Sequence, residues 1–259
     1  MLIQFFSWSG PENVSSSLSD LQIGDKVAVQ HKWGVLIGTL VGMGESGENV
    51  VGDVLRKAEA QDFETILQNK KKEKKYLKDV KGEVRKSGLT MKVVDVTLTL
   101  DGGCLIVFFV ADARVDFREL VKTISSKLGK SVRFQQVGAR DEAKKMGGFG
   151  ICGRELCCVK FSRGLQSITT NMARSQLIAH RGSERLSGLC GRLMCCLAYE
   201  SKQYEDLLKG LPTRGEKVIY KGKEFKVVDV IVLEEEVKIT DDKGTMIVVG
   251  VSELDERDT

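Results

Sequence analysis

Six of the seven cysteines in this chain of 259 residues occur in two copies of one short sequence. The copies read CGRELCC (152–158) and CGRLMCC (190–196), so that Cys152 recurs as Cys190, 38 positions later. The six residues are Cys152, Cys157, Cys158, Cys190, Cys195 and Cys196. Thiolates bind zinc and iron–sulfur clusters, so a fold that joins the two copies offers a metal site.

The spacing within each copy separates two cysteines by four residues and places a third directly after them. Structural zinc sites usually contain C-x2-C, whereas a C-x4-C step occurs in plant-type ferredoxins, so the spacing favours an iron–sulfur cluster over zinc. Adjacent side chains point in different directions, so Cys158 and Cys196 are expected to be buried or to serve a second site. The expected ligands are Cys152, Cys157, Cys190 and Cys195, with thiolates of a partner chain as possible additions.

Other interpretations of the same residues stay open. The six cysteines can pack as small apolar side chains, and His180 can join three of them in a zinc site. Arg154 and Arg192 follow each Cys-Gly pair, where an arginine can offset thiolate charge or contact a phosphate. The preceding GGFG (147–150) predicts a sharp turn.

Composition points to a soluble, non-catalytic chain of the reducing cytoplasm. Hydrophobic residues make up 42%, the net charge is only +4, and no apolar run approaches the roughly 18 residues of a membrane helix. The first residues lack the features of a signal peptide. Motifs for a P-loop, a C-x-x-C redox dithiol and a G-x-S-x-G nucleophile are absent, so an enzyme is not expected.

Hydrophobic periodicity predicts an α+β chain of three modules. Residues 1–57 contain short apolar runs and turn signals typical of a small β-barrel-like module, in which His31 and Trp33 lie in a surface turn. Residues 58–211 form a central α-β-β-α-β layer followed by the Cys-rich helical segment. Residues 212–259 form a second small β-barrel-like module.

The first expected helix, at 62–86, carries both an apolar stripe and a basic face. The buried stripe is expected to be Phe63, Ile66, Leu67, Leu77, Val80 and Val84. The basic face includes Lys70, Lys71, Lys72, Lys74 and Lys75, which are either solvated or in contact with nucleic acid or a partner. In the second helix Asp116 and Glu119 predict a capping box, and Cys104 is expected to be a core residue.

Several segments together resemble the YaaT (also called RicT) proteins of bacteria, which contain the polymerase-suppressor (PSP-one) C-terminal domain. The segments include DGGCLIVFF (101–109), ADARVDFRELVK (111–122), VGARDEAKKMGGFGICGRELCC (137–158) and LSGLCGRLMCCLAYE (186–200). The likeness extends over roughly residues 27–200. Ile151 departs from the proline that family members have before the first Cys-Gly-Arg.

The resemblance implies a cytoplasmic regulator without enzymatic activity. It implies a complex with two small helical regulatory proteins that carries [4Fe–4S] clusters, held through the six cysteines named above. It also implies a role in mRNA maturation by ribonuclease Y and in sporulation, competence and biofilm formation. From the residues alone, the competing hypothesis is a zinc-stabilised protein that binds RNA by itself.

Overall fold

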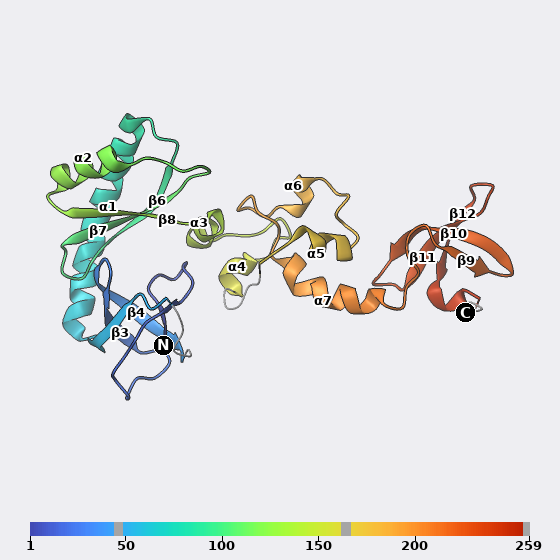
Figure 1. Ribbon diagram of the computed structural model, residues 1–259, viewed down its shortest axis with the longest axis horizontal. Coiled ribbons are helices and arrows are strands. Elements are labelled where there is room, and N and C mark those ends of the chain that lie inside the picture. The colour runs from blue at the N-terminus through green and yellow to red at the C-terminus, as the bar shows by residue number, and fades with distance from the viewer. Residues whose placement is uncertain (44–48, 162–166, 256–259) are drawn as a thin grey trace. The chain divides into compact units, whose positions relative to one another are not determined.

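The computed structural model describes residues 1–43, 49–161 and 167–255. The chain forms two compact units, Met1–Arg163 and Gly164–Thr259, and both contain helices and strands (Figure 1). The α+β class is confirmed. The division at residues 57 and 211 stays a prediction.

The N-terminal module is a curled five-stranded sheet with the order β2-β1-β4-β3-β5. Its strands are β1 (Leu2–Gln4), β2 (Glu12–Asn13), β3 (Lys26–His31), β4 (Gly34–Gly42) and β5 (Gly52–Lys57). The chain just after β2 bonds to the free edge of β5, where Ser15 N–H donates to Gly52 C=O (3.0 Å) and Val54 N–H donates to Ser15 C=O (2.9 Å). These bonds join the two edges of the sheet and make it curl toward a barrel.

His31 differs from its predicted place in a surface turn. It is the last residue of β3, and only 2% of its surface is exposed. Its ring packs edge-on against Phe5 at 5.4 Å, and its Nδ1 accepts the Trp33 N–H at 3.4 Å. The hairpin turn itself consists of the next two residues, because His31 pairs with Gly34 across the strands.

The central layer follows the predicted α-β-β-α-β order. Its elements are α1 (Ala60–Ser87), β6 (Lys92–Leu98), β7 (Cys104–Val110), α2 (Arg118–Leu128) and β8 (Ser131–Gln136). β7 is central, antiparallel to β6 and parallel to β8. α2 provides the crossover that a parallel pair requires.

Strand β7 explains why its sequence, CLIVFFV, is apolar at every position. Leu105 and Val107 face a core that α1 and α2 complete. Ile106 and Phe108 face the opposite way and pack with Trp8 and Leu36 of the N-terminal module. Because both faces are covered, no position of the strand alternates with a polar residue. The helices therefore cover one face of the sheet, as predicted, and the N-terminal module covers the other.

The predicted apolar stripe of α1 is correct only in its C-terminal half. Val80 and Val84 are buried against the sheet. Phe63 and Leu67 are 42% and 61% exposed, so their predicted burial is wrong. The buried residues of the first turns are Asp62, which accepts two hydrogen bonds from Arg56, and Asn69.

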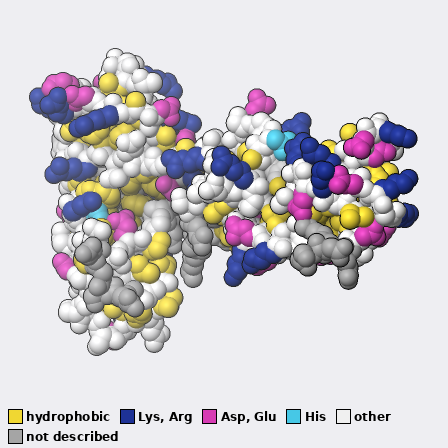
Figure 2. Space-filling view, turned by 45° about the vertical axis from the view of Figure 1, so that its right-hand side comes forward, with side chains coloured by type: hydrophobic (Ala, Val, Ile, Leu, Met, Phe, Trp, Pro, Cys, Tyr) yellow, Lys and Arg dark blue, Asp and Glu magenta, His cyan; other side chains and the backbone are white. Residues whose placement is uncertain are grey.

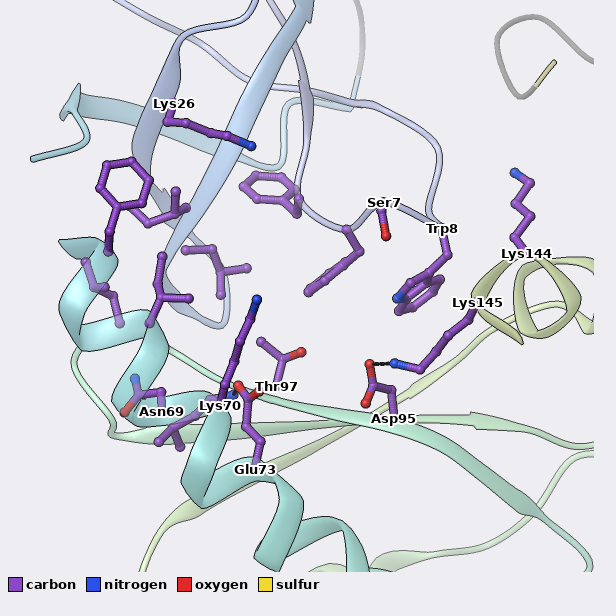
Figure 3. Close-up of a pocket in the computed structure, with 18 residues that line it drawn as sticks. Ser7, Trp8, Lys26, Asn69, Lys70, Glu73, Asp95, Thr97, Lys144 and Lys145 are labelled. Carbon is purple, nitrogen blue, oxygen red and sulfur yellow. Dashed lines mark hydrogen bonds and ion pairs between the residues drawn. The ribbon is translucent and has the colours of Figure 1, made fainter. Parts of the chain in front are cut away.

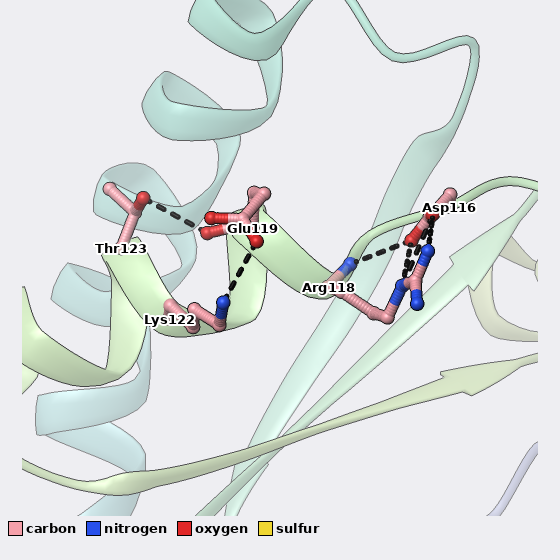
Figure 4. Close-up of polar contacts among 5 residues, drawn as sticks. All are labelled: Asp116, Arg118, Glu119, Lys122 and Thr123. Atoms are coloured by element: carbon pink, nitrogen blue, oxygen red, sulfur yellow. Dashed lines mark hydrogen bonds and ion pairs between the residues drawn. The ribbon is translucent and has the colours of Figure 1, made fainter.

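Helix α2 begins without the predicted capping box (Figure 4). The Asp116 carboxylate accepts the Arg118 N–H at 3.1 Å and the Arg118 guanidinium at 2.6 Å. These bonds, led by those from the guanidinium, lower the pKa of Asp116 to about 2. The Glu119 carboxylate pairs with Lys122 (2.9 Å), one turn further on, instead of reaching back to the N-cap.

Short helices carry the chain through the Cys-rich segment. They are α3 (Ala139–Met146), α4 (Cys157–Lys160), α5 (Thr170–Ser175) and α6 (Ser183–Leu186), followed by the longer α7 (Cys196–Leu208). The helices predicted near residues 140–145, 170–178 and 196–209 are thus present. In the part of the chain that the structure describes, every helix is too short or too polar to cross a membrane.

The C-terminal module is a four-stranded antiparallel sheet with the order β12-β11-β10-β9. Its strands, β9 (Lys217–Tyr220), β10 (Lys223–Ile231), β11 (Glu236–Thr240) and β12 (Met246–Gly250), match the four predicted runs, and the short helix η1 (Val251–Glu253) follows. Tyr204, Leu207 and Leu208 from the end of α7 pack against the core of this sheet. Lys and Arg side chains lie at several separate places on the face drawn in Figure 2.

Candidate functional site

The first cysteine sequence folds into a tight hairpin that we call the first knuckle (148–158). Gly150 N–H donates to Arg154 C=O at 2.8 Å, and Gly153 N–H donates back to Gly150 C=O at 2.9 Å. Leu156 N–H donates to Gly148 C=O at 3.1 Å and closes the base of the hairpin. The three bonds hold a loop of fixed shape between two short extended segments.

The three thiols of the first knuckle lie in different environments. Cys152 is exposed in the loop, Cys157 is half-buried at the first residue of α4, and Cys158 is buried, with 5% of its surface exposed. Cys158 faces a different environment from Cys157 because adjacent helical residues point about 100° apart. The knuckle therefore has two accessible thiols, one on the loop and one at the helix start.

The second knuckle (186–196) contains the same three backbone hydrogen bonds as the first. Gly188 N–H donates to Arg192 C=O at 2.8 Å, and Gly191 N–H donates to Gly188 C=O at 2.9 Å. Met194 N–H donates to Leu186 C=O at 2.9 Å. Each donor and acceptor stands 38 positions after its counterpart, so the sequence repeat is also a structural repeat.

The second knuckle continues directly into α7. Cys195 is the N-cap residue of α7, Cys196 is its first residue, and both are half-buried, as is Cys190 on the loop. Gln176 of the segment after α5 donates from its buried amide to Leu197 C=O at 2.7 Å. This bond and the packing of Ala173 against Leu197 fix the start of α7 below the cysteines.

A glycine lies beside the loop thiol in both knuckles. A Cβ atom added to Gly150 would lie 3.5 Å from Cys152 Sγ, and one added to Gly188 would lie 3.9 Å from Cys190 Sγ. Both distances are ordinary van der Waals contacts, so an added methyl group would not displace the sulfur. The two loop thiols therefore have matching neighbours in the two knuckles.

Neither knuckle by itself presents a set of metal ligands. Among the described residues, no group of three or more His, Cys, Asp or Glu side chains is arranged to hold a metal ion. The first knuckle belongs to the first compact unit and the second to the second unit. A set of four thiolates therefore requires both knuckles or further ligands from a partner.

The other residues singled out by the sequence lie partly on the knuckles and partly away from them. Arg154 and Arg192 are exposed on the knuckles, and His180 is exposed between α5 and α6. The exposed lysines of α1 are Lys70, Lys71, Lys72, Lys74 and Lys75. Cys104 is buried at the start of β7, as predicted, and its burial raises the pKa of its thiol.

The knuckles expose apolar side chains that were not predicted from the sequence. Ile151 is 72% exposed directly before Cys152, and Leu189 is 60% exposed directly before Cys190. Phe149 adds a third exposed apolar side chain to the first knuckle. The repeat contained the signal, because an aliphatic residue precedes Cys-Gly-Arg in both copies.

Two family models match the chain over the elements just described. The PSP1 C-terminal conserved region matches residues 52–137, from β5 to the end of the central layer. The third domain of PSP1-like proteins matches residues 167–211, which include the second knuckle and α7. The chain belongs to the PSP1 family.

One individual protein is similar to this chain over most of its length. The chain is 39% identical over 186 residues to the stage 0 sporulation protein YaaT of Bacillus subtilis (strain 168). The aligned region spans 72% of this chain and 67% of the relative. The resemblance deduced from the cysteine sequences is thereby confirmed. No solved structure matches the chain significantly.

Proposed function

We propose that the chain is a regulatory adaptor without catalytic activity of its own, assembled around a thiolate-bound iron–sulfur cluster. The observation that carries this proposal is the repeat of the knuckle, in which the same three hydrogen bonds present thiols at positions 38 residues apart. The relative's name, a sporulation protein, supports a regulatory role. Two thiols in each knuckle suit a four-ligand cluster.

The proposed ligands are Cys152, Cys157, Cys190 and Cys195. A cluster held by these thiolates would supply binding free energy that stabilises the folded knuckles, because a metal site rarely exists in the unfolded chain. The half-buried Cys196 is the further thiol that we propose for a second cluster or for one shared with a partner. The cofactor that we propose is a [4Fe–4S] cluster, and its loss would weaken the assembly.

The proposed partners are two small helical regulatory proteins and an endoribonuclease of the ribonuclease Y type, whose action on mRNA the adaptor would direct. The exposed Ile151, Leu189 and Phe149 support protein contacts at the knuckles, since apolar side chains beside a site favour association. Sporulation, competence and biofilm formation are the proposed outputs. The proposed location is the cytoplasm, where thiols remain reduced.

A second candidate function is RNA binding by a zinc-stabilised chain acting alone. The five exposed lysines of α1 favour it, because lysines that neutralise phosphates release counterions. On single-stranded RNA, this hypothesis predicts that log affinity falls by about 0.7 per contacted phosphate for each log unit of salt. RNA binding that does not change with salt would exclude it.

The first prediction concerns metal and partner binding by cysteine variants prepared without oxygen. Cys152→Ser and Cys195→Ser should lose the broad visible absorption of the cluster together with iron and sulfide, because each removes one of four ligands. Binding to the two helical proteins should fall with the cluster. Absorption, metal and sulfide analysis and a pull-down with purified partners measure these effects.

Cys104→Ala is the matched control, because it removes a thiol outside both knuckles. It should retain the cluster and partner binding. Wild-type partner affinity in Cys152→Ser would refute the adaptor mechanism. One zinc per chain without colour would favour the RNA-binding hypothesis.

A further inference from the structure

A cavity of about 630 Å³ lies within the first compact unit and is lined by residues other than the cysteines (Figure 3). Its walls come from the loop after β1, from β3 and β4, from the first half of α1, from β6 and from α3. Sites for small organic ligands typically measure about 300–1,000 Å³, so this volume suits a ligand of nucleotide size. The iron–sulfur site proposed at the knuckles does not involve this cavity.

Four aromatic side chains line the cavity. Phe5, Phe6 and Trp8 of the N-terminal module line it, and Phe63 of α1 adds a fourth ring. Phe6 stacks on Trp8 with ring centroids 5.3 Å apart and planes at 17°. Phe63 was predicted to be buried in the apolar stripe of α1, but it is exposed because it lines this cavity. Trp8 itself is buried, with 7% of its surface exposed, so Phe5, Phe6 and Phe63 are the rings that a flat, apolar ligand ring can contact.

Four lysines line the same cavity, and three of them contact other side chains. Lys145 forms an ion pair with Asp95, Lys144 lies 3.7 Å from the Asp141 carboxylate, and Lys26 donates to Thr39 Oγ1 at 2.5 Å. Lys70 forms no ion pair with any residue that the structure describes, and its ammonium points into the cavity in Figure 3. Lys70 interacts electrostatically with Glu73, which also lines the cavity, but it is not held in an ion pair, so it can pair with an anionic group.

Two carboxylates lie on the floor of the cavity. Glu73 accepts the Leu98 N–H at 2.8 Å through one of its two oxygens, and Asp95 stands beside Lys145. Carboxylate oxygens accept several hydrogen bonds, so both groups can also receive hydroxyl or amino groups of a ligand. The cavity thus combines four aromatic side chains, a lysine outside any described ion pair and hydrogen-bond acceptors.

We propose that this cavity binds a nucleoside phosphate, with the base against the aromatic side chains and the phosphate at Lys70. Glu73 and Asp95 accept hydrogen bonds from the ribose hydroxyls or the base amino group. Each part of this ligand has a complementary group in the cavity: the phosphate can pair with the lysine, the base can contact the aromatic rings, and the hydroxyl or amino groups can donate to the carboxylates. Both a free nucleotide and one residue of single-stranded RNA have this chemistry. The proposal does not depend on the cysteines.

The test is titration of the full chain with AMP, ATP, inorganic phosphate and a hexamer of adenylates. Trp8 fluorescence is the readout, in a Trp33→Phe background that removes the second tryptophan. AMP and ATP should quench Trp8 saturably and phosphate alone should not. Lys70→Gln should weaken binding at least about tenfold, the loss expected for one charge-assisted hydrogen bond.

Lys71→Gln is the matched control, because Lys71 is exposed on the same helix and does not line the cavity. It should change affinity less than about twofold, as expected for a surface charge. Saturation by the hexamer alone, with the same dependence on Lys70, would support the site and assign it to RNA. Cys152→Ser should bind AMP like the parent, which separates this proposal from the cluster.

Two outcomes would overturn the proposal. One is the absence of saturable quenching by any nucleotide or by the hexamer up to about 1 mM, the concentration that corresponds to roughly 4 kcal/mol of binding. The other is an equal loss in Lys70→Gln and Lys71→Gln, which would indicate a diffuse effect of the basic helix. Circular dichroism verifies that each variant is folded.

Discussion

The conformation of the knuckles depends on one glycine in each, Gly153 and Gly191. Their φ angles are +75° and +72°, in the left-handed region, and each glycine donates the hydrogen bond that turns the loop. A residue with a Cβ pays roughly 1–2 kcal/mol to adopt this conformation. The Cys-Gly-Arg order is therefore required by the backbone, since the residue after the loop cysteine must turn left-handed.

Gly153→Ala should consequently weaken cluster binding even though it leaves every thiol in place. A strain of 1–2 kcal/mol corresponds to roughly 5- to 30-fold in an equilibrium constant. Iron and sulfide content after reconstitution, and the rate at which a chelator removes the iron, measure the change. Gly182→Ala is the control, because Gly182 has a φ of −51° and open space around its Cα. Unchanged iron retention in Gly153→Ala would show that the loop conformation does not support the site.

The sequence was sufficient to predict that the two cysteine segments correspond, but not how far each thiol is buried. The repeat spacing predicted which thiols correspond, and both hairpins have the same bonds. Cys158 is buried whereas Cys196 is half-buried, and this difference was not predictable, because α4 packs against α3 while α7 packs against α5. Ligand number depends on contacts over long sequence distances, which local periodicity does not specify.

At the scale of elements, helix α1 carries two glutamates in opposite electrostatic environments. Burial raises the pKa of Glu73 above its usual range, although its bond from Leu98 N–H and nearby lysines act the other way. Hydrogen bonds from Lys127 and Lys86 lower the pKa of Glu83. The same helix therefore contains one carboxylate that disfavours the folded state when ionised and one that favours it.

The substitution of glutamine at these two positions should have opposite effects. Glu73→Gln keeps an oxygen for Leu98 N–H and removes the buried charge, so the variant should melt higher than the parent at pH 7. This advantage should disappear as the pH falls below the raised pKa, where Glu73 becomes neutral in the parent. Thermal unfolding between pH 7 and pH 4 measures it.

Glu83→Gln is the paired control with the opposite sign. It removes the carboxylate that pairs with Lys127 at 2.8 Å and Lys86 at 3.2 Å, so it should lower the melting temperature at pH 7. The difference from the parent should shrink as the pH falls through the lowered pKa of Glu83, where the pairs are lost. Equal effects of the two substitutions would contradict the assigned environments.

Helices and strands were predictable wherever the pattern of apolar residues came from packing on a single neighbouring surface. The four strands of the C-terminal module and the order of the central layer follow from local alternation and turns. Periodicity failed in the first half of α1, because it identifies an apolar face without identifying what that face contacts. Phe63 faces a cavity instead of the sheet. His31 was misplaced for a related reason, since the rings of Phe5 and Trp33 bury it through contacts that a turn signal does not reveal.

At the scale of the whole molecule, the two knuckles fall in separate compact units. Each unit has its own hydrophobic core, with β7 at the centre of one and β10 and β11 in the other. A cluster with ligands from both knuckles would therefore couple the unfolding of two units that each have a core of their own. Ligation of each knuckle by a partner chain would leave them independent.

Calorimetry of the full chain with and without its cluster distinguishes these two arrangements. Without the cluster we expect two unfolding transitions, one for each unit. If the cluster is shared within the chain, loading should shift both transitions upward and bring them together, because a ligand at 100 times its Kd adds about 2.7 kcal/mol to the folded state that binds it. Cys195→Ser should restore two separate transitions under loading conditions, since the second unit then loses a ligand. A cluster that stabilises one transition and leaves the other in place would contradict the four-thiolate set and favour ligands from a partner chain.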